Sequence, residues 1–69
     1  MSMVKVESST IKEVSYENCI LIVKFMNGSV YSYSDVPPKV YEDFINSHSK
    51  GKFLHENIKG QYKHCKLTD

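Results

Sequence analysis

The first half of the chain alternates apolar and polar side chains in the way that is typical of β-strands. In residues 9–16 the apolar positions are Ile11, Val14 and Tyr16. The three-residue step from Ile11 to Val14 breaks the period of two, so we expect a β-bulge or a strong twist near Lys12-Glu13. A turn at Glu17-Asn18 ends this predicted strand.

Two further strands follow in the sequence. Residues 19–26 are rich in β-branched and aromatic side chains, and residues 29–34 form the returning strand. Asn27-Gly28 lies between these two segments and is a strong short-range signal for a hairpin turn. The three segments together predict an antiparallel meander.

The second half of the chain changes to helical spacing. Pro37-Pro38 ends strand pairing and favours a first helical turn, for which Asp35 is a candidate cap. This helix should end near residues 46–48, and its apolar stripe comprises Val40, Tyr41, Phe44 and Ile45. Ser49 is the expected cap of a second, shorter helix that ends at Gly60, with a stripe of Phe53, Leu54 and Ile58.

The order of these elements predicts an α+β fold with a single domain over residues 1–69. Its expected architecture is a small antiparallel three-stranded β-meander followed by two short helices packed on one face. Residues 1–8 are a lead-in or a short edge strand, because Val4 and Val6 alternate, and residues 61–69 form a tail that packs back in extended conformation. A domain of this size buries only about 60% of its unfolded surface, so it depends on a well-packed core or on oligomerisation.

The loop after the second strand decides where Tyr31 and Tyr33 point, since a shift of one residue turns every side chain to the other face. A two-residue turn makes the tyrosines an exposed aromatic platform beside Lys24, suited to stacking a base. A three-residue loop, with its glycine in a left-handed conformation, pairs Tyr31 with Val23 and Tyr33 with Leu21. We favour the second register, because it gathers the apolar positions under the helices. The tyrosine hydroxyls would then line a cleft beside the second helix.

The favoured register leaves three apolar side chains, Ile20, Ile22 and Val30, on the opposite face of the sheet. In so small a protein, an exposed apolar patch favours self-association. We therefore expect a homodimer through the Ile20/Ile22/Val30 face.

The net charge of +1 is unevenly distributed along the chain. Residues 1–49 carry four lysines and six acidic residues, and residues 50–69 carry five lysines and two acidic residues. The positive second segment favours a phosphate-bearing partner, although lysines that are merely solvated give the same count. The sequence has no arginine, so bidentate recognition of guanine is excluded and phosphate contacts fall to lysine.

The segment Ser49-Lys50-Gly51-Lys52 stands where the second helix is expected to begin. Free backbone N–H groups and the helix dipole favour an anion at such a position, and a glycine permits close approach. A serine followed by lysines is also common in a purely structural role. The candidate ligand- and phosphate-binding residues are Ser49, Lys50, Gly51, Lys52, Lys59 and Lys63, with Tyr31 and Tyr33 near a base or ribose.

The sequence contains no pattern of a catalytic or metal centre. The three histidines, Cys19 and Cys65 lack the spacing of a zinc site, and there is no P-loop. We therefore predict no enzymatic activity, no metal and no cofactor. Residues 19–23 are the longest apolar run, too short to cross a membrane, and no signal-peptide core is present, which favours a cytoplasmic protein with free thiols.

The combined pattern closely resembles the KTSC domain family over about residues 8–63. This family is a short module found at the C-terminus of some lysyl-tRNA synthetases and alone in bacterial and phage proteins. The resemblance rests on Ser8-Ser9, Ile11, Val14, Tyr16, Leu21, Val23, Phe25, Gly28, Tyr31-Ser32-Tyr33, Val36-Pro37-Pro38, Val40-Tyr41, Phe44, Ser49-Lys50-Gly51-Lys52-Phe53, Asn57-Ile58-Lys59 and Tyr62. It implies a central tyrosine-x-tyrosine motif, a proposed role in RNA binding and no enzymatic activity. Ile20 and Ile22 depart from the family pattern, where these positions are often polar.

Two functions are compatible with these observations. The first is a non-catalytic module that binds RNA or a phosphorylated nucleotide. The alternative is a phage or mobile-element accessory protein that sequesters a host signalling nucleotide or blocks a host protein. For the first function we expect modest affinity that weakens as salt concentration rises, because few phosphates are neutralised.

Overall fold

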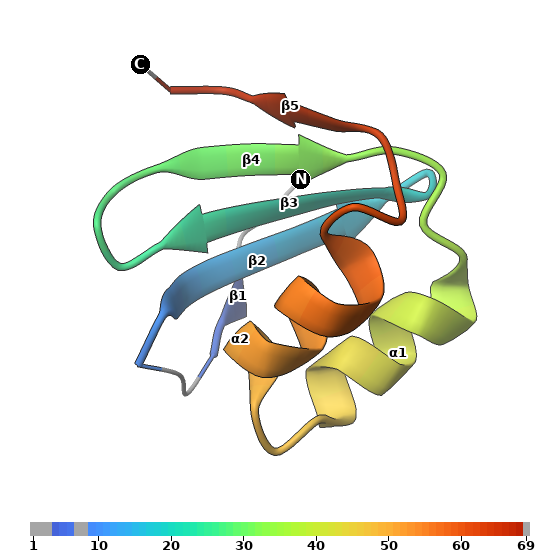
Figure 1. The fold of residues 1–69 in the computed structure, drawn as a ribbon, viewed down its shortest axis with the longest axis horizontal. Coiled ribbons are helices and arrows are strands. Elements are labelled where there is room, and N and C mark those ends of the chain that lie inside the picture. Colours follow the sequence, from blue (N-terminus) through green and yellow to red (C-terminus); the bar gives the residue numbers. More distant parts are fainter. Residues whose placement is uncertain (1–3, 7–8, 69) are drawn as a thin grey trace.

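The computed structural model describes residues 4–6 and 9–68, so residues 1–3 and 7–8 of the expected lead-in and Asp69 of the tail lie outside the described residues. The expected meander is present as β2 (Ile11–Glu17), β3 (Ile20–Phe25) and β4 (Val30–Tyr33). Two short strands extend it at either edge, β1 (Val4–Lys5) beside β2 and β5 (His64–Lys66) beside β4. The result is an antiparallel sheet in the order β1-β2-β3-β4-β5, with the helices on one face (Figure 1). The predicted α+β class is confirmed.

The expected bulge lies in β2. Ile11 pairs with Phe25 and Glu13 pairs with Lys24, so Lys12 is the additional residue. A bulge turns the strand by one residue, which brings Ile11 and Val14 to the same face in spite of their three-residue spacing. Both side chains are fully buried.

The turn between β2 and β3 differs from the expectation. It consists of Asn18 and Cys19, with φ angles of 52° and 64°, and Glu17 and Ile20 pair across it. Positive φ at both central residues is the signature of a two-residue type I′ hairpin, which matches the twist of the flanking strands. The predicted turn at Glu17-Asn18 was therefore wrong by one residue, and Cys19 belongs to the turn.

The hairpin between β3 and β4 has the favoured three-residue loop. Val23 pairs with Tyr31 and Leu21 pairs with Tyr33. The N–H of Phe25 donates to the Ser29 carbonyl at 2.8 Å, and Gly28 has a φ of 93°. A left-handed residue at the end of such a loop is the position that glycine occupies without steric cost. The tyrosines consequently face the helices.

The helical segment comprises α1 (Pro38–Asn46), α2 (Lys50–Phe53) and the π-helical turn η1 (Leu54–Ile58), which continues α2 directly. Pro37 occupies the N-cap position of α1, and Asp35 lies two residues earlier with a φ of 59°, so Asp35 is not the cap that was predicted. Ser49 does occupy the N-cap position of α2, but its hydroxyl makes no capping hydrogen bond. No helix in the described part of the chain is long and apolar enough to span a membrane.

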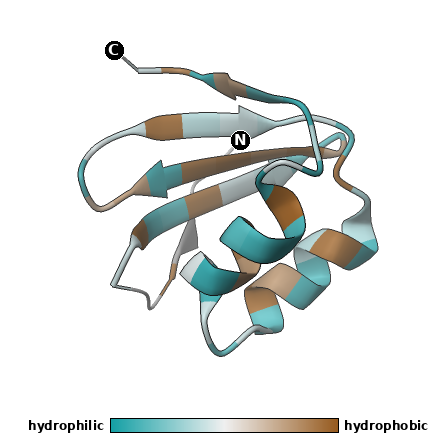
Figure 2. Ribbon diagram, viewed as in Figure 1, coloured by the Kyte–Doolittle hydropathy of each residue, from teal (hydrophilic) through white to brown (hydrophobic). Residues whose placement is uncertain are grey.

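The core lies between the sheet and the helices. In Figure 2 the brown of hydrophobic residues extends along most of β3 and returns at intervals along α1. The stacked rings of Tyr16 and Tyr41, 4.4 Å apart, join β2 to α1, and the Tyr16 hydroxyl donates to the Val36 carbonyl. The buried apolar side chains are Ile11, Val14, Leu21, Val23, Tyr33, Val36, Phe44, Leu54 and Ile58.

Candidate functional site

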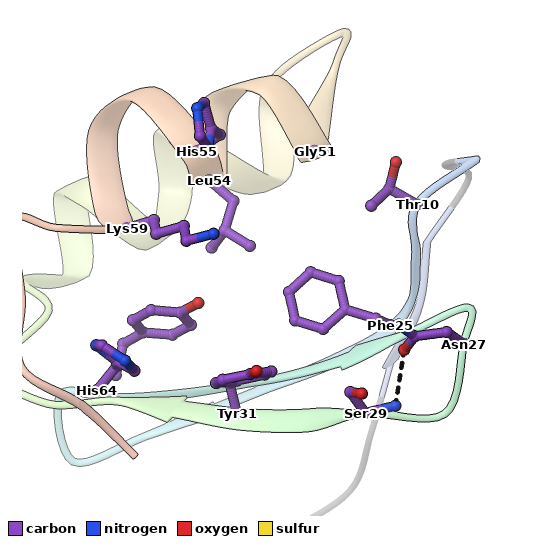
Figure 3. A pocket seen from close by; sticks show the side chains of 11 residues that line it. Thr10, Phe25, Asn27, Ser29, Tyr31, Gly51, Leu54, His55, Lys59 and His64 are labelled. Carbon is purple, nitrogen blue, oxygen red and sulfur yellow. Dashed lines mark hydrogen bonds between the residues drawn. The ribbon is translucent and has the colours of Figure 1, made fainter. Parts of the chain in front are cut away.

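A cleft of about 370 Å³ opens between the β3–β4 hairpin and the helical segment α2–η1 (Figure 3). We call it the aromatic cleft. Its size falls within the range of small-molecule sites. Its lining comprises Thr10, Phe25, Asn27, Ser29, Tyr31, Tyr33, Gly51, Leu54, His55, Lys59 and His64. The predicted cleft beside the second helix, with tyrosines at its edge, is therefore present.

Aromatic rings form one wall of this cleft. Phe25 meets Tyr31 edge to face, with ring centroids 5.7 Å apart. His64, which reaches the cleft from β5, lies 6.2 Å from Tyr31 and 6.1 Å from Tyr33. The sheet registers explain this grouping, because Tyr33 pairs with His64 across β4 and β5 and adjacent partners share a face.

The two tyrosines differ in burial. Tyr33 is only 2% exposed and belongs to the core, whereas Tyr31 is half-buried and presents more of its ring to the cleft. Burial, with a smaller contribution from neighbouring Tyr31, raises the pKa of the Tyr33 hydroxyl. This hydroxyl therefore remains protonated at neutral pH and can donate a hydrogen bond.

The π-helical turn places Lys59 in the cleft. In an α-helix, residues five apart are about 140° apart around the axis, so Leu54 and Lys59 would not share a side. Here the N–H of Lys59 donates to the Leu54 carbonyl at 2.7 Å, the i to i+5 bond of a π turn. Figure 3 shows the Leu54 side chain and the Lys59 ammonium group directed toward the cleft.

A second, smaller hollow of about 160 Å³ lies at the start of α2. We call it the lysine hollow, and it is lined by Ser9, Thr10, His48, Ser49, Lys50, Gly51 and Lys52. The Lys50 ammonium donates to the Ser47 carbonyl at 3.2 Å, and the Ser49 N–H donates to the Ser47 hydroxyl at 3.2 Å. These bonds fix the approach to the helix. Lys50 is half-buried and tied to the Ser47 carbonyl, whereas Lys52 is exposed.

Gly51 and Thr10 line both depressions and form the wall between them. A Cβ atom at position 51 would lie 3.2 Å from the Thr10 Cβ, which is tighter than ordinary van der Waals contact. The missing side chain of Gly51 therefore serves the close approach of α2 to the start of β2. From the sequence, Gly51 was expected to let an anion approach, and its packing against Thr10 was not predicted.

The structure distributes the predicted site residues over three places. The segment 49–52 lines the lysine hollow, and Tyr31, Tyr33 and Lys59 line the aromatic cleft. Lys63 lines neither of them; its backbone carbonyl accepts the N–H of Ser34 at 2.8 Å. Apart from Lys63, the predicted site residues thus lie around the wall of Thr10 and Gly51 that the two depressions share.

Several lining residues were not identified from the sequence. The three-residue loop brings Phe25, Asn27 and Ser29 to the cleft. The favoured register could have predicted these three positions. To predict His64 in the cleft, one would have to know that β5 pairs with β4. To predict His55 and Leu54, one would have to know of the π turn that contains them. Among residues 4–6 and 9–68, no group of three or more His, Cys, Asp and Glu side chains is arranged to hold a metal ion.

The chain matches relatives of two kinds. Lysine–tRNA ligases of Nostoc punctiforme and Trichormus variabilis are 44% and 43% identical over 68 residues, which is 96% of this chain and 12% of each ligase. The chain thus spans about an eighth of the length of these relatives. A protein of Tsukamurella paurometabola is 35% identical over 63 residues, which covers 88% of this chain and 94% of that protein.

A solved structure supports the same assignment. The crystal structure of a KTSC domain protein from Yersinia pestis superimposes with a TM-score of 0.89 at 31% identity, covering 97% of both chains. The protein-family model of the KTSC domain matches residues 7–62 of this chain. The predicted resemblance is therefore confirmed, and the chain belongs to the KTSC domain family.

Proposed function

We propose that this KTSC domain is a non-catalytic module that binds a phosphorylated nucleotide, either free or within a single-stranded segment of RNA. The base would lie in the aromatic cleft and the phosphate in the lysine hollow. One observation carries the proposal: the two depressions share the wall formed by Thr10 and Gly51, so a single ligand can occupy both.

The chemistry of the two depressions differs in the way that the two ends of a nucleotide differ. Aromatic side chains such as the half-buried Tyr31 offer a surface for a base, and stacking of this kind contributes about 1–3 kcal/mol per base. Lys50 and Lys52 supply positive charge in the lysine hollow. Because these are the two lysines among the described residues that line it, few phosphates are neutralised and we expect modest affinity.

A base in the aromatic cleft cannot remain paired within a duplex. Sequence-specific and stacking contacts to RNA are made mainly with single-stranded loops and ends. The lysine–tRNA ligases among the relatives are named for a reaction with tRNA. Their match to this chain supports RNA as the polymer from which the nucleotide would be presented.

The test measures binding of a fluorescently labelled single-stranded RNA of mixed sequence by anisotropy, with mononucleotides as competitors. Lys50→Glu together with Lys52→Glu should abolish binding while leaving the melting temperature nearly unchanged. The matched control is Lys12→Glu with Lys39→Glu, which makes the same change in charge at exposed lysines that line neither depression. The control should retain most of the affinity.

The salt dependence identifies the mode of binding. A slope of log affinity against log salt of roughly −0.7 to −1.4 corresponds to one or two phosphates of a single strand in the lysine hollow. Competition by mononucleotides at similar concentration indicates that a single nucleotide occupies the site, whereas competition by RNA alone indicates a longer footprint. Undiminished binding by the Lys50/Lys52 variant would refute the site, and absence of binding by any RNA or nucleotide would refute the function.

A further inference from the structure

Two side chains of the aromatic cleft carry groups that can only donate hydrogen bonds. The Asn27 side-chain oxygen already accepts the backbone N–H of Ser29 at 2.9 Å, and the Asn27 amide nitrogen is a donor for a ligand. Lys59 contributes an ammonium group, which can only donate. The hydroxyl groups of Ser29 and the tyrosines rotate and can serve as donor or acceptor.

Among residues 4–6 and 9–68, no acidic side chain lines this cleft. An acidic residue would be the obligatory acceptor that pairs with the amino group of a base. The two histidines in the lining can supply either a donor or an acceptor, depending on tautomer. Among the described lining side chains, a ligand in the cleft therefore meets the obligatory donors of Lys59 and Asn27, while the obligatory acceptor, the Asn27 oxygen, already accepts the Ser29 N–H.

Lys59 stands apart from the lysines of the second depression. It lines the aromatic cleft but not the lysine hollow, and its hydrogen bond to Leu54 fixes its backbone on the cleft side of the π turn. In Figure 3 its side chain extends over the space between Leu54 and His64, on the side of the cleft opposite Tyr31. An ammonium group at this place can reach the edge of a base that lies against the tyrosine.

We propose that Lys59 contacts O6 of guanine or O4 of uracil, so that the aromatic cleft prefers these two bases to adenine and cytosine. The inference rests on the proposed nucleotide-binding function and assigns Lys59 to the base, in place of the phosphate contact expected from the sequence. At the corresponding position adenine and cytosine carry an amino group. That group is itself a donor and would face the ammonium without a hydrogen bond.

Calorimetric titration with the 5′-monophosphates of guanosine, uridine, adenosine and cytidine tests the proposal on the whole chain. Guanosine and uridine monophosphates should bind roughly 5- to 20-fold more tightly than their amino counterparts, a range that one good polar contact to a base supplies. All four share the same phosphate, so the lysine hollow contributes equally to each.

Three variants locate the preference. Lys59→Met keeps the length of the apolar stem, and it should reduce the ratio between keto and amino nucleotides to about one. Lys50→Met should weaken all four nucleotides by a similar factor and leave the ratio intact. Lys63→Met is the matched control, because Lys63 lines neither depression, and it should behave as the wild type. Thermal unfolding of each variant verifies that it is folded.

The outcomes separate this inference from the function on which it rests. Equal affinities for the four nucleotides, or tighter binding of the amino bases, would overturn the inference and leave the nucleotide-binding function standing. A preference that survives in Lys59→Met would overturn the role of Lys59. If none of the four nucleotides and no single-stranded RNA binds, both proposals fail.

Discussion

The two faces of the sheet are built from similar residues and have different surroundings. On β3, Leu21 and Val23 point toward the helices and are fully buried, while Ile20 points away and is 41% exposed. Ile22, also on the outer face, is half-buried. The face that the helices cover carries the core and both depressions. The residues of β3 and β4 that line the aromatic cleft, Phe25, Tyr31 and Tyr33, all lie on this covered face.

The difference shows that apolar content alone does not locate the core or the site. A strand that is apolar on both sides is compatible with either register, because each gives a hydrophobic inner face. The loop with Gly28 selects one of them, and this choice brings Tyr31 and Tyr33 to the helices. The position of the aromatic cleft thus depends on one turn.

The largest expected effect contrasts the two faces at neighbouring positions. Leu21→Ala removes a fully buried side chain and should lower the free energy of unfolding by about 2–5 kcal/mol, enough to unfold much of the protein. Ile22→Ala, at the half-buried position beside it, should cost less than half as much. Urea denaturation monitored by circular dichroism measures both. Equal losses would show that the outer face is as closely packed as the inner one.

Gly28 provides the next test, because it fixes the register that separates the faces. Its φ of 93° disfavours any side chain, and no atom lies within 4 Å of a Cβ placed there. Gly28→Ala should therefore cost about 1–2 kcal/mol from backbone strain alone. Gly28→Asn should cost less, since asparagine tolerates left-handed conformations. A Gly28→Ala protein as stable as the wild type would contradict the importance of this loop.

The sequence predicted the features that depend on local chemistry. The bulge follows from the spacing of Ile11 and Val14, the three-residue loop from Gly28, and the first helix from Pro37-Pro38. Clustering of the segment 49–52 in one hollow also agrees with the expected helix start. Each of these patterns is contained within a few residues.

Other features depend on contacts that a local pattern does not encode. The turn at Asn18-Cys19 requires a cysteine with positive φ, for which its residue type gives no signal. The π turn widens the helix at Leu54–Ile58 and brings Lys59 into the cleft, although the apolar spacing of Leu54 and Ile58 suits an ordinary α-helix equally well. His64 enters the cleft only because β5 pairs with β4.

Alkaline pH should lower the stability of the protein through Tyr33, the buried tyrosine of the inner face. Its pKa is raised above the ordinary value of 10.0, chiefly by burial. From about pH 10 upward the unfolded chain loses this proton while the folded protein keeps it, so ionisation favours unfolding and stability falls as pH rises. Tyr33→Phe should show a smaller loss of stability between pH 9 and pH 11, relative to its own value at pH 7. A decline identical to that of the wild type would exclude Tyr33 as a cause.

The smallest effect concerns self-association through the outer face. We propose that the Ile20/Ile22/Val30 face forms a homodimer. Ile22 and Val30 are already half-buried within one chain, and Ile20 is the most exposed of the three. Apolar burial contributes about 25 cal/mol per Å², so the remaining exposed area supports only weak association. Sedimentation velocity should show concentration-dependent dimerisation of the wild type and a monomeric Ile22→Glu variant. Gln61→Glu adds the same charge at an exposed position away from this face and should dimerise normally. A wild type that stays monomeric at high concentration would mean that the outer face is simply solvated.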